Sequence, residues 1–194
     1  MILKNKNKNP CFISVKMILL FSEAIKMNDK INSLDFFREN LRLTANTFPI
    51  EVNMAFYNGP KWVEPGASYD IIKASLESGL TWRVLINTPE IANTFSRYKS
   101  EIVRENWKKL AEKYPHELLV RECKIPFLHI YHAIKTFDET ANKESAKSHI
   151  KFFAYDKEGI LIPAGDEVYE SGSEGYEIYD NEFEFLWENA IPIL

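Results

Sequence analysis

The chain has 194 residues, which is enough for one domain of ordinary size with a substantial core. Hydrophobic residues make up 45% of it and charged residues 27%, a globular composition that argues against intrinsic disorder. The net charge of −4 does not favour a nucleic-acid partner, since a basic surface normally supplies that affinity. The two cysteines, Cys11 and Cys123, form no disulfide framework, so we expect a reducing compartment and a cytoplasmic location.

The first 26 residues differ in charge from the rest of the chain. Residues 1–26 hold five Lys and one Glu, a charge of +4, so residues 27–194 carry −8. The apolar run Met17–Phe21 is too short for the core of a signal peptide. It is also far below the ~20 residues of a membrane span. We therefore expect a disordered extension over 1–26, a single α/β domain over 27–194, and no membrane span.

The hydrophobic pattern predicts alternating helices and strands in the first part of this domain. Apolar residues three to four positions apart predict helices over 31–43, 68–79 and 96–114. The alternating segment 51–57 and the apolar run 81–86 predict two strands, each followed by a turn signal. Because a helix-length segment separates these strands, we expect them to lie parallel in one sheet.

The last part of the chain is richer in strands. Four runs predict consecutive strands, over 118–121, 127–137, 148–155 and 160–162. A polar loop is expected over 138–147, and a short helix, Glu182–Ala190, closes the chain. The order β-α-β-α followed by several strands predicts an α/β fold with a mixed β-sheet flanked by helices.

The sequence lacks several common catalytic motifs. It contains no glycine-rich phosphate loop, no Gly-x-Ser-x-Gly elbow and no His-Glu-x-x-His helix. Cys123, His129 and His132 are metal ligands by residue type. However, His129 and His132 are three positions apart in a predicted strand, so they point to opposite faces. We therefore expect neither a metal site nor a cofactor.

One segment carries a more specific pattern, Ser148-His-Ile-Lys-Phe-Phe-Ala-Tyr-Asp156. It places His149, Lys151 and Asp156 in a His-x-Lys-x4-Asp motif. In a strand, His149 and Lys151 project from the same face, so an imidazole and an ammonium group can converge on one phosphate. The imidazole can attack phosphorus, the lysine can neutralise its oxygens, and a carboxylate can orient the ring.

This motif resembles the signature of the phospholipase D superfamily. Glu182–Ala190 is similar to that family's C-terminal helix, which a Phe and a Leu-Trp pair anchor, and the segment 54–86 is similar to its opening β-α-β unit. The resemblance covers Ile50–Leu194, one half-repeat with one motif. It implies a phospholipase-D-like fold. It also implies an active site that needs two copies of the chain, with the second His149 as general acid.

The sequence departs from the family pattern after Asp156. The family has a Gly-Ser-x-Asn turn six residues further on, where this chain has Pro163-Ala-Gly-Asp166. In a second register, His129 is the family histidine and Tyr131 replaces the lysine, which leaves the site inactive. Two functions stay open. One is a non-catalytic sensing or interaction domain, which the departures favour. The other is a homodimeric phosphodiester hydrolase, with His149 as the nucleophile.

Both functions place His149 and Lys151 at the surface of the domain. An active site has them at the mouth of a cleft. An inactive one has them on a surface strand whose Ile150, Phe152 and Ala154 pack inward. Because an exposed histidine contributes little to folding, we expect His149→Ala to leave the stability nearly unchanged.

Overall fold

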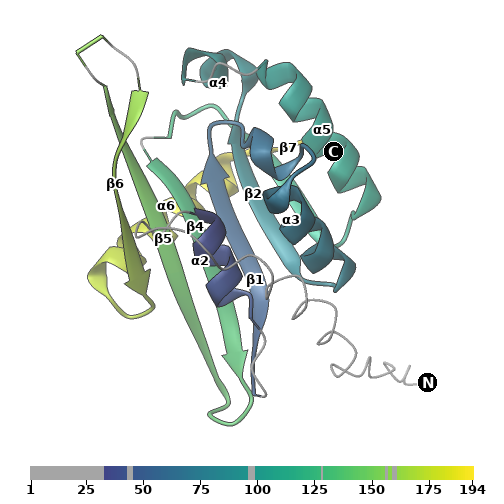
Figure 1. The fold of residues 1–194 in the computed structure, drawn as a ribbon, viewed down its shortest axis with the longest axis vertical. Coiled ribbons are helices and arrows are strands. Elements are labelled where there is room, and N and C mark those ends of the chain that lie inside the picture. The colour runs from purple at the N-terminus through teal and green to yellow at the C-terminus, as the bar shows by residue number, and fades with distance from the viewer. Residues whose placement is uncertain (1–32, 43–45, 96–98, 128, 156, 159–160) are drawn as a thin grey trace.

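The protein is built on one mixed β-sheet with helices on both faces (Figure 1). The computed structural model describes residues 33–42, 46–95, 99–127, 129–155, 157–158 and 161–194. Its strands are β1 (Thr47–Phe56), β2 (Thr81–Asn87), β3 (Leu118–Cys123), β4 (His129–Asp138), β5 (Lys143–Tyr155), β6 (Leu161–Glu170) and β7 (Ile191–Pro192). Its helices are α2 (Ser33–Asn40), η2 (Pro60–Trp62, a 3-10 turn), α3 (Ala67–Glu77), α4 (Pro89–Phe95), α5 (Ser100–Lys113) and α6 (Glu174–Asn189). The expected mixed α/β architecture is confirmed.

The strands follow the order β6-β5-β4-β1-β2-β3-β7 across the sheet. β1 and β2 are parallel, from Glu51 opposite Thr81 to Phe56 opposite Ile86, and β2 is also parallel to β3. Helix α3 lies in the connection from β1 to β2, so the predicted parallel β-α-β unit is confirmed. Beyond β1, the strands β4, β5 and β6 continue the sheet in antiparallel pairs.

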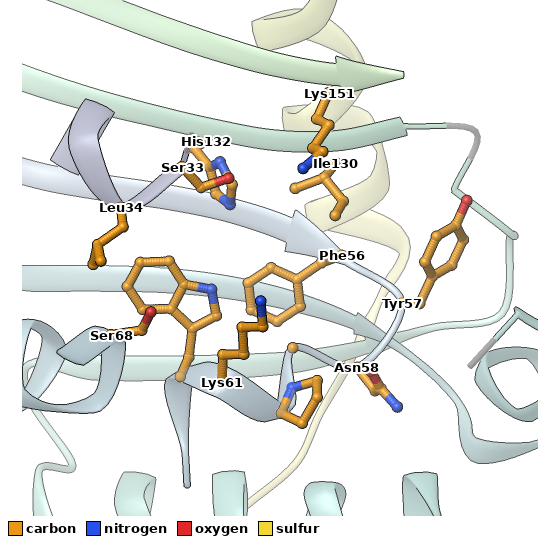
Figure 2. Close-up of a pocket in the computed structure, with 13 residues that line it drawn as sticks. Ser33, Leu34, Phe56, Tyr57, Asn58, Lys61, Ser68, Ile130, His132 and Lys151 are labelled. Carbon is orange, nitrogen blue, oxygen red and sulfur yellow. The ribbon is translucent and has the colours of Figure 1, made fainter. Parts of the chain in front are cut away.

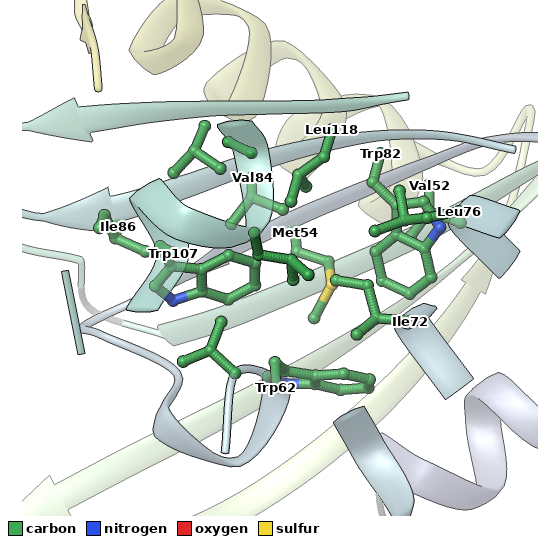
Figure 3. Close-up of a cluster of buried hydrophobic side chains, with 14 of the residues drawn as sticks. Val52, Met54, Trp62, Ile72, Leu76, Trp82, Val84, Ile86, Trp107 and Leu118 are labelled. Carbon is green, nitrogen blue, oxygen red and sulfur yellow. The ribbon is translucent and has the colours of Figure 1, made fainter. Parts of the chain in front are cut away.

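Alternation along the strands divides the core into two layers. Helices α2, α3 and α5 cover the larger layer, which contains three of the four tryptophans (Figure 3). Val52, Met54 and Phe56 project from β1 into this layer, whereas Ala55 belongs to the smaller layer beneath α6. The central strands are therefore buried on both faces.

A contact that is both ionic and aromatic fixes α6 to its face of the sheet. Arg83 of β2 donates two hydrogen bonds to Glu184 of α6, at 2.7 and 2.6 Å. The same guanidinium lies over the rings of Phe183 and Trp187, at 5.1 and 4.5 Å from their centroids. Bidentate geometry and aromatic cover make this pair stronger than an exposed ion pair.

The strands of the second half are longer than the sequence predicts. The loop expected over 138–147 is confined to residues 139–142, since β4 runs to Asp138 and β5 begins at Lys143. Asp138 closes the short turn between them, because its Oδ1 accepts hydrogen bonds from the backbone N–H groups of Thr140 and Ala141. The polar sequence of this segment suggests a loop because most side chains at this end of the hairpin are exposed. A strand that is exposed on both faces has no alternation of apolar residues by which it could be recognised.

The last helix is also longer than predicted. Helix α6 begins at Glu174 rather than at Glu182. Ser173 caps it, since its Oγ accepts a hydrogen bond from the N–H of Tyr176. The acidic residues of the first turns obscure the helical pattern in the sequence.

Two expectations fall wholly or partly outside the residues that the structure describes. The extension over 1–26 lies within 1–32, none of which is described. The helix expected over 96–114 corresponds to α5 only from Ser100 onward, and residues 96–98 are not described. No helix within the described ranges is long and apolar enough to cross a membrane.

Each outer strand of the sheet contains a proline. Pro163 lies in β6, and Pro192 lies in β7, opposite Arg121 of β3. The pairing of β6 also shifts in register, between Phe152 and Phe153 of β5. Because proline has no N–H, each outer strand lacks one hydrogen-bond donor.

The turn after β1 requires a glycine at position 59. Gly59 has a φ of 60°, and a Cβ there would overlap the ring of Phe56. We predict that Gly59→Ala lowers the free energy of unfolding by about 3 kcal/mol, as measured by chemical denaturation, because left-handed strain and steric overlap act together. Gly79 is the matched control, since its φ is 86° but no atom lies within 4 Å of its added Cβ. Gly79→Ala should cost only about 1 kcal/mol. Equal losses would contradict the overlap at Phe56.

Candidate functional site

Two of the three predicted motif residues can be placed, and both lie on β5. His149 and Lys151 project from the same face of this strand, as expected, and α2 covers that face at His149. Asp156 lies outside the described residues. Its role as the orienting carboxylate therefore stays a prediction.

His149 is buried, and the expectation that it is exposed is wrong. Its side chain has no accessible surface, and its ring stacks on Phe36 of α2 with 5.4 Å between centroids. Its Nε2 lies 3.1 Å from Oδ2 of Asp166 on β6. Because His149 belongs to the packed interior, His149→Ala would leave a cavity and destabilise the fold.

A second histidine, His132 of β4, lies directly opposite His149 in the ladder. The two rings are nearly parallel, with 5.8 Å between centroids, and Phe37 of α2 packs edge-on against His132. Burial holds the pKa of His132 well below its usual value, and the nearby His149 and Lys151 lower it further. Burial also lowers the pKa of His149, although Asp166 offsets part of this effect. Both imidazoles are therefore neutral at pH 7.

His129, the histidine of the alternative register, lies on the opposite face of the sheet. Its ring packs edge-on against Tyr179 of α6, and its Nε2 lies 3.5 Å from Glu182. Since His132 faces α2, the prediction that His129 and His132 point to opposite faces is confirmed. Within the described ranges, no group of His, Cys, Asp and Glu could hold a metal ion.

A cleft of about 510 Å³ opens on the same face as His132 (Figure 2). It lies where β1 ends, between α2 on one side and the segment of η2 and α3 on the other. Sites at the carboxyl ends of parallel strands are common, since neighbouring helices leave a crevice there. Its apolar walls come from Leu34, Phe56, Trp62 and Ile130.

The cleft is positively charged. Lys61 of η2 and Lys151 of β5 extend toward each other from its two sides (Figure 2). No Asp or Glu is among the described residues that line it. Neither lysine has an ion-pair partner in the described part of the chain, whereas Lys135 and Lys147 do. The local charge is thus opposite in sign to the net charge of −4.

Helix α5 fixes the turn that forms one wall of the cleft. The Nε1 of Trp107 donates to the backbone oxygen of Asn58 at 2.8 Å, and Nδ2 of Asn58 donates to Oγ of Ser100 at 3.1 Å. The left-handed Gly59 then turns the chain directly into η2. These contacts hold Lys61 beside the cleft.

The sequence pattern identifies only a small part of this site. It singles out Lys151, but Asn58-Gly59-Pro60 reads only as the end of a strand. Nothing in the pattern relates Lys61 to His132, which are far apart in sequence. One signal could have pointed to Lys61. It directly follows the turn Asn58-Gly59-Pro60, which lies at the carboxyl end of the predicted parallel strand 51–57, where ligand sites are common.

The buried histidines predict a loss of stability in mild acid. As the pH falls below about 6.5, His132 takes up a proton in the unfolded chain but not in the folded one, so the free energy of unfolding falls. Between about pH 7.5 and pH 5.5, this proton uptake should lower the free energy of unfolding by about 1.4 kcal/mol, and we predict that His132→Phe removes this loss. Chemical denaturation at several pH values measures it. The control is His116→Gln, a change at an exposed histidine, and an equal effect of the two substitutions would contradict the assignment.

Comparison with known proteins identifies no relative of this chain. No protein-family model matches the chain, and no curated protein or solved structure matches it. The resemblance to the phospholipase D superfamily thus rests on the sequence motifs alone.

Proposed function

We propose that this protein is a non-catalytic binding domain that holds a small organic anion in the cleft beside β1. The observation that carries the proposal is that Lys61 and Lys151 face each other in a cleft with no carboxylate in its described lining. Two ammonium groups without counter-ions repel each other, and a bound anion replaces this repulsion with attraction. The proposal belongs to the sensing or interaction class that the sequence favours.

The size and lining of the cleft support an organic ligand rather than a bare ion. A volume of about 510 Å³ is typical of sites for small molecules. Phe56 and Trp62 supply aromatic surface, and Leu34 and Ile130 supply aliphatic surface. An organic skeleton that lies on these walls gains hydrophobic affinity in addition to the attraction of the lysines.

The burial of His149 supports the non-catalytic role over the hydrolase. A nucleophilic histidine has to reach a phosphorus atom, but Phe36 covers His149 and Asp166 engages its Nε2. The alternative, a homodimeric phosphodiester hydrolase with His149 as nucleophile, would require α2 to leave the sheet. Of the two motif residues that the structure describes, Lys151 lines the cleft, where it can bind an anion without any chemical step.

The phospholipase-D-like half-repeat and the cytoplasmic location are parts of the same proposal. A parallel β-α-β unit, then antiparallel strands and a C-terminal helix anchored by Phe183 and Trp187, is the order that the resemblance implies. The free, buried thiol of Cys123 suits a reducing compartment.

We predict that the protein binds phenyl phosphate and not benzylamine, a cation with a similar ring. Titration of the full chain, followed through backbone amide NMR signals, should give a saturable shift around Lys61 and Lys151. Lys151→Gln should weaken the binding about tenfold, the usual effect of losing one charge-assisted hydrogen bond. Added salt should weaken it further through screening.

The matched control is Lys109→Gln, which removes one positive charge from an exposed position on α5. This substitution should leave the affinity for phenyl phosphate unchanged. Comparable binding of benzylamine, or an equal loss in both lysine variants, would contradict an anion site in the cleft.

We also predict no hydrolysis of bis(4-nitrophenyl) phosphate above the uncatalysed rate at any protein concentration. The reason is that the buried His149 cannot approach the phosphorus. Release of nitrophenolate measures the reaction. Turnover that Lys151→Gln and His149→Ala both abolish, in variants that circular dichroism shows to be folded, would establish the hydrolase instead.

A further inference from the structure

The cleft contains one polar group that anion binding by the lysines does not explain, the imidazole of His132. This residue is only 1% exposed, and its ring lies at the wall of the cleft beside Ser33 (Figure 2). Its Nδ1 has no hydrogen-bond partner within the described ranges. Because buried polar groups are nearly always hydrogen-bonded, a ligand that reaches this ring would satisfy an unmet requirement.

The charge of the cleft indicates a doubly charged anion. A single carboxylate would balance only one of the two lysines. A phosphate monoester carries a charge of about −1.5 to −2 at pH 7, with three oxygens that face different directions. This group suits Lys61 and Lys151, which approach from opposite sides of the cleft.

Between the lysines and His132 the cleft is aromatic. The ring of Trp62 lies edge-on to His132, with 6.1 Å between centroids, and Phe56 lies near the lysines (Figure 2). Aromatic walls favour a flat ring, which gains contact area at a small cost in conformational entropy. If that ring has polar atoms on its edge, these atoms can reach the imidazole.

We infer that His132 is the specificity-determining residue of the cleft, and that the ligand is a phosphate monoester with a flat, hydrogen-bonding ring, the chemistry of a nucleoside monophosphate. Lys61 and Lys151 hold the phosphate, and the polar edge of the base hydrogen-bonds to His132. A neutral imidazole donates or accepts according to its tautomer, so His132 recognises a polar ring edge without fixing one base. This inference rests on the proposed function.

The test compares whole ligands with their parts. The full chain is titrated with the four common nucleoside monophosphates, with the matching nucleosides, with ribose 5-phosphate and with inorganic phosphate. At least one monophosphate should bind about tenfold more tightly than ribose 5-phosphate, since it adds a hydrogen bond to His132 and ring contacts. The imidazole ¹⁵N signals of His132 should shift with that monophosphate and not with ribose 5-phosphate.

Substitution separates the two ends of the cleft. His132→Phe should lower the affinity for the monophosphate to about that for ribose 5-phosphate, and leave the affinity for ribose 5-phosphate unchanged. Lys151→Gln should weaken the binding of the monophosphate and of ribose 5-phosphate alike, and Lys109→Gln should weaken the binding of neither. If His132→Phe does not fold, the ¹⁵N signals of the unsubstituted protein decide the question.

The outcomes distinguish this inference from the proposed function. If every monophosphate binds no more tightly than ribose 5-phosphate and the His132 signals do not move, the inference is wrong while the anion site stands. If the nucleoside monophosphates, ribose 5-phosphate and phenyl phosphate all fail to bind, the proposed function is wrong as well.

Discussion

The turn at Asn58 and Gly59 is the constraint on which the arrangement of the cleft depends. It ends the first parallel strand, and two hydrogen bonds between the turn and α5 hold it in place. Beneath the turn, the ring of Phe56 stacks on the ring of Trp107. The turn that a ligand in the cleft would contact therefore packs directly on the hydrophobic core. The wall of the cleft is thus held by contacts with the core, and a preformed wall would lower the entropic cost of the proposed binding.

The opposite wall has a different origin, because α2 serves the core and the cleft together. Its Phe36 and Phe37 bury two histidines that behave, while neutral, as flat aromatic side chains. Its Ser33 and Leu34 face the cleft. A change in the charge of the imidazoles therefore acts on the helix that shapes the site. Core packing and the proposed ligand binding thus share one element.

The sequence predicts the elements whose pattern is set by the core. The parallel unit from β1 to β2 is recognisable because its strands are buried and its helix is amphipathic. The hairpin around Asp138 is not, since its exposed residues carry no apolar period. For His149, a strand pattern shows which side chains share a face but not what covers that face. The cover, Phe36, lies more than a hundred positions earlier in the chain.

The prolines of the two outer strands have a consequence for the behaviour of the protein in concentrated solution. A sheet grows when the free edge of one molecule pairs with that of another, and continued growth gives cross-β aggregates. Pro163 removes one N–H group from the outer strand at one edge, and the two-residue β7 with Pro192 forms the other edge. The carboxylates of Asp166 and Glu167 on β6 add repulsion between like edges. These features make the two edges of the sheet poorer templates for pairing with another molecule.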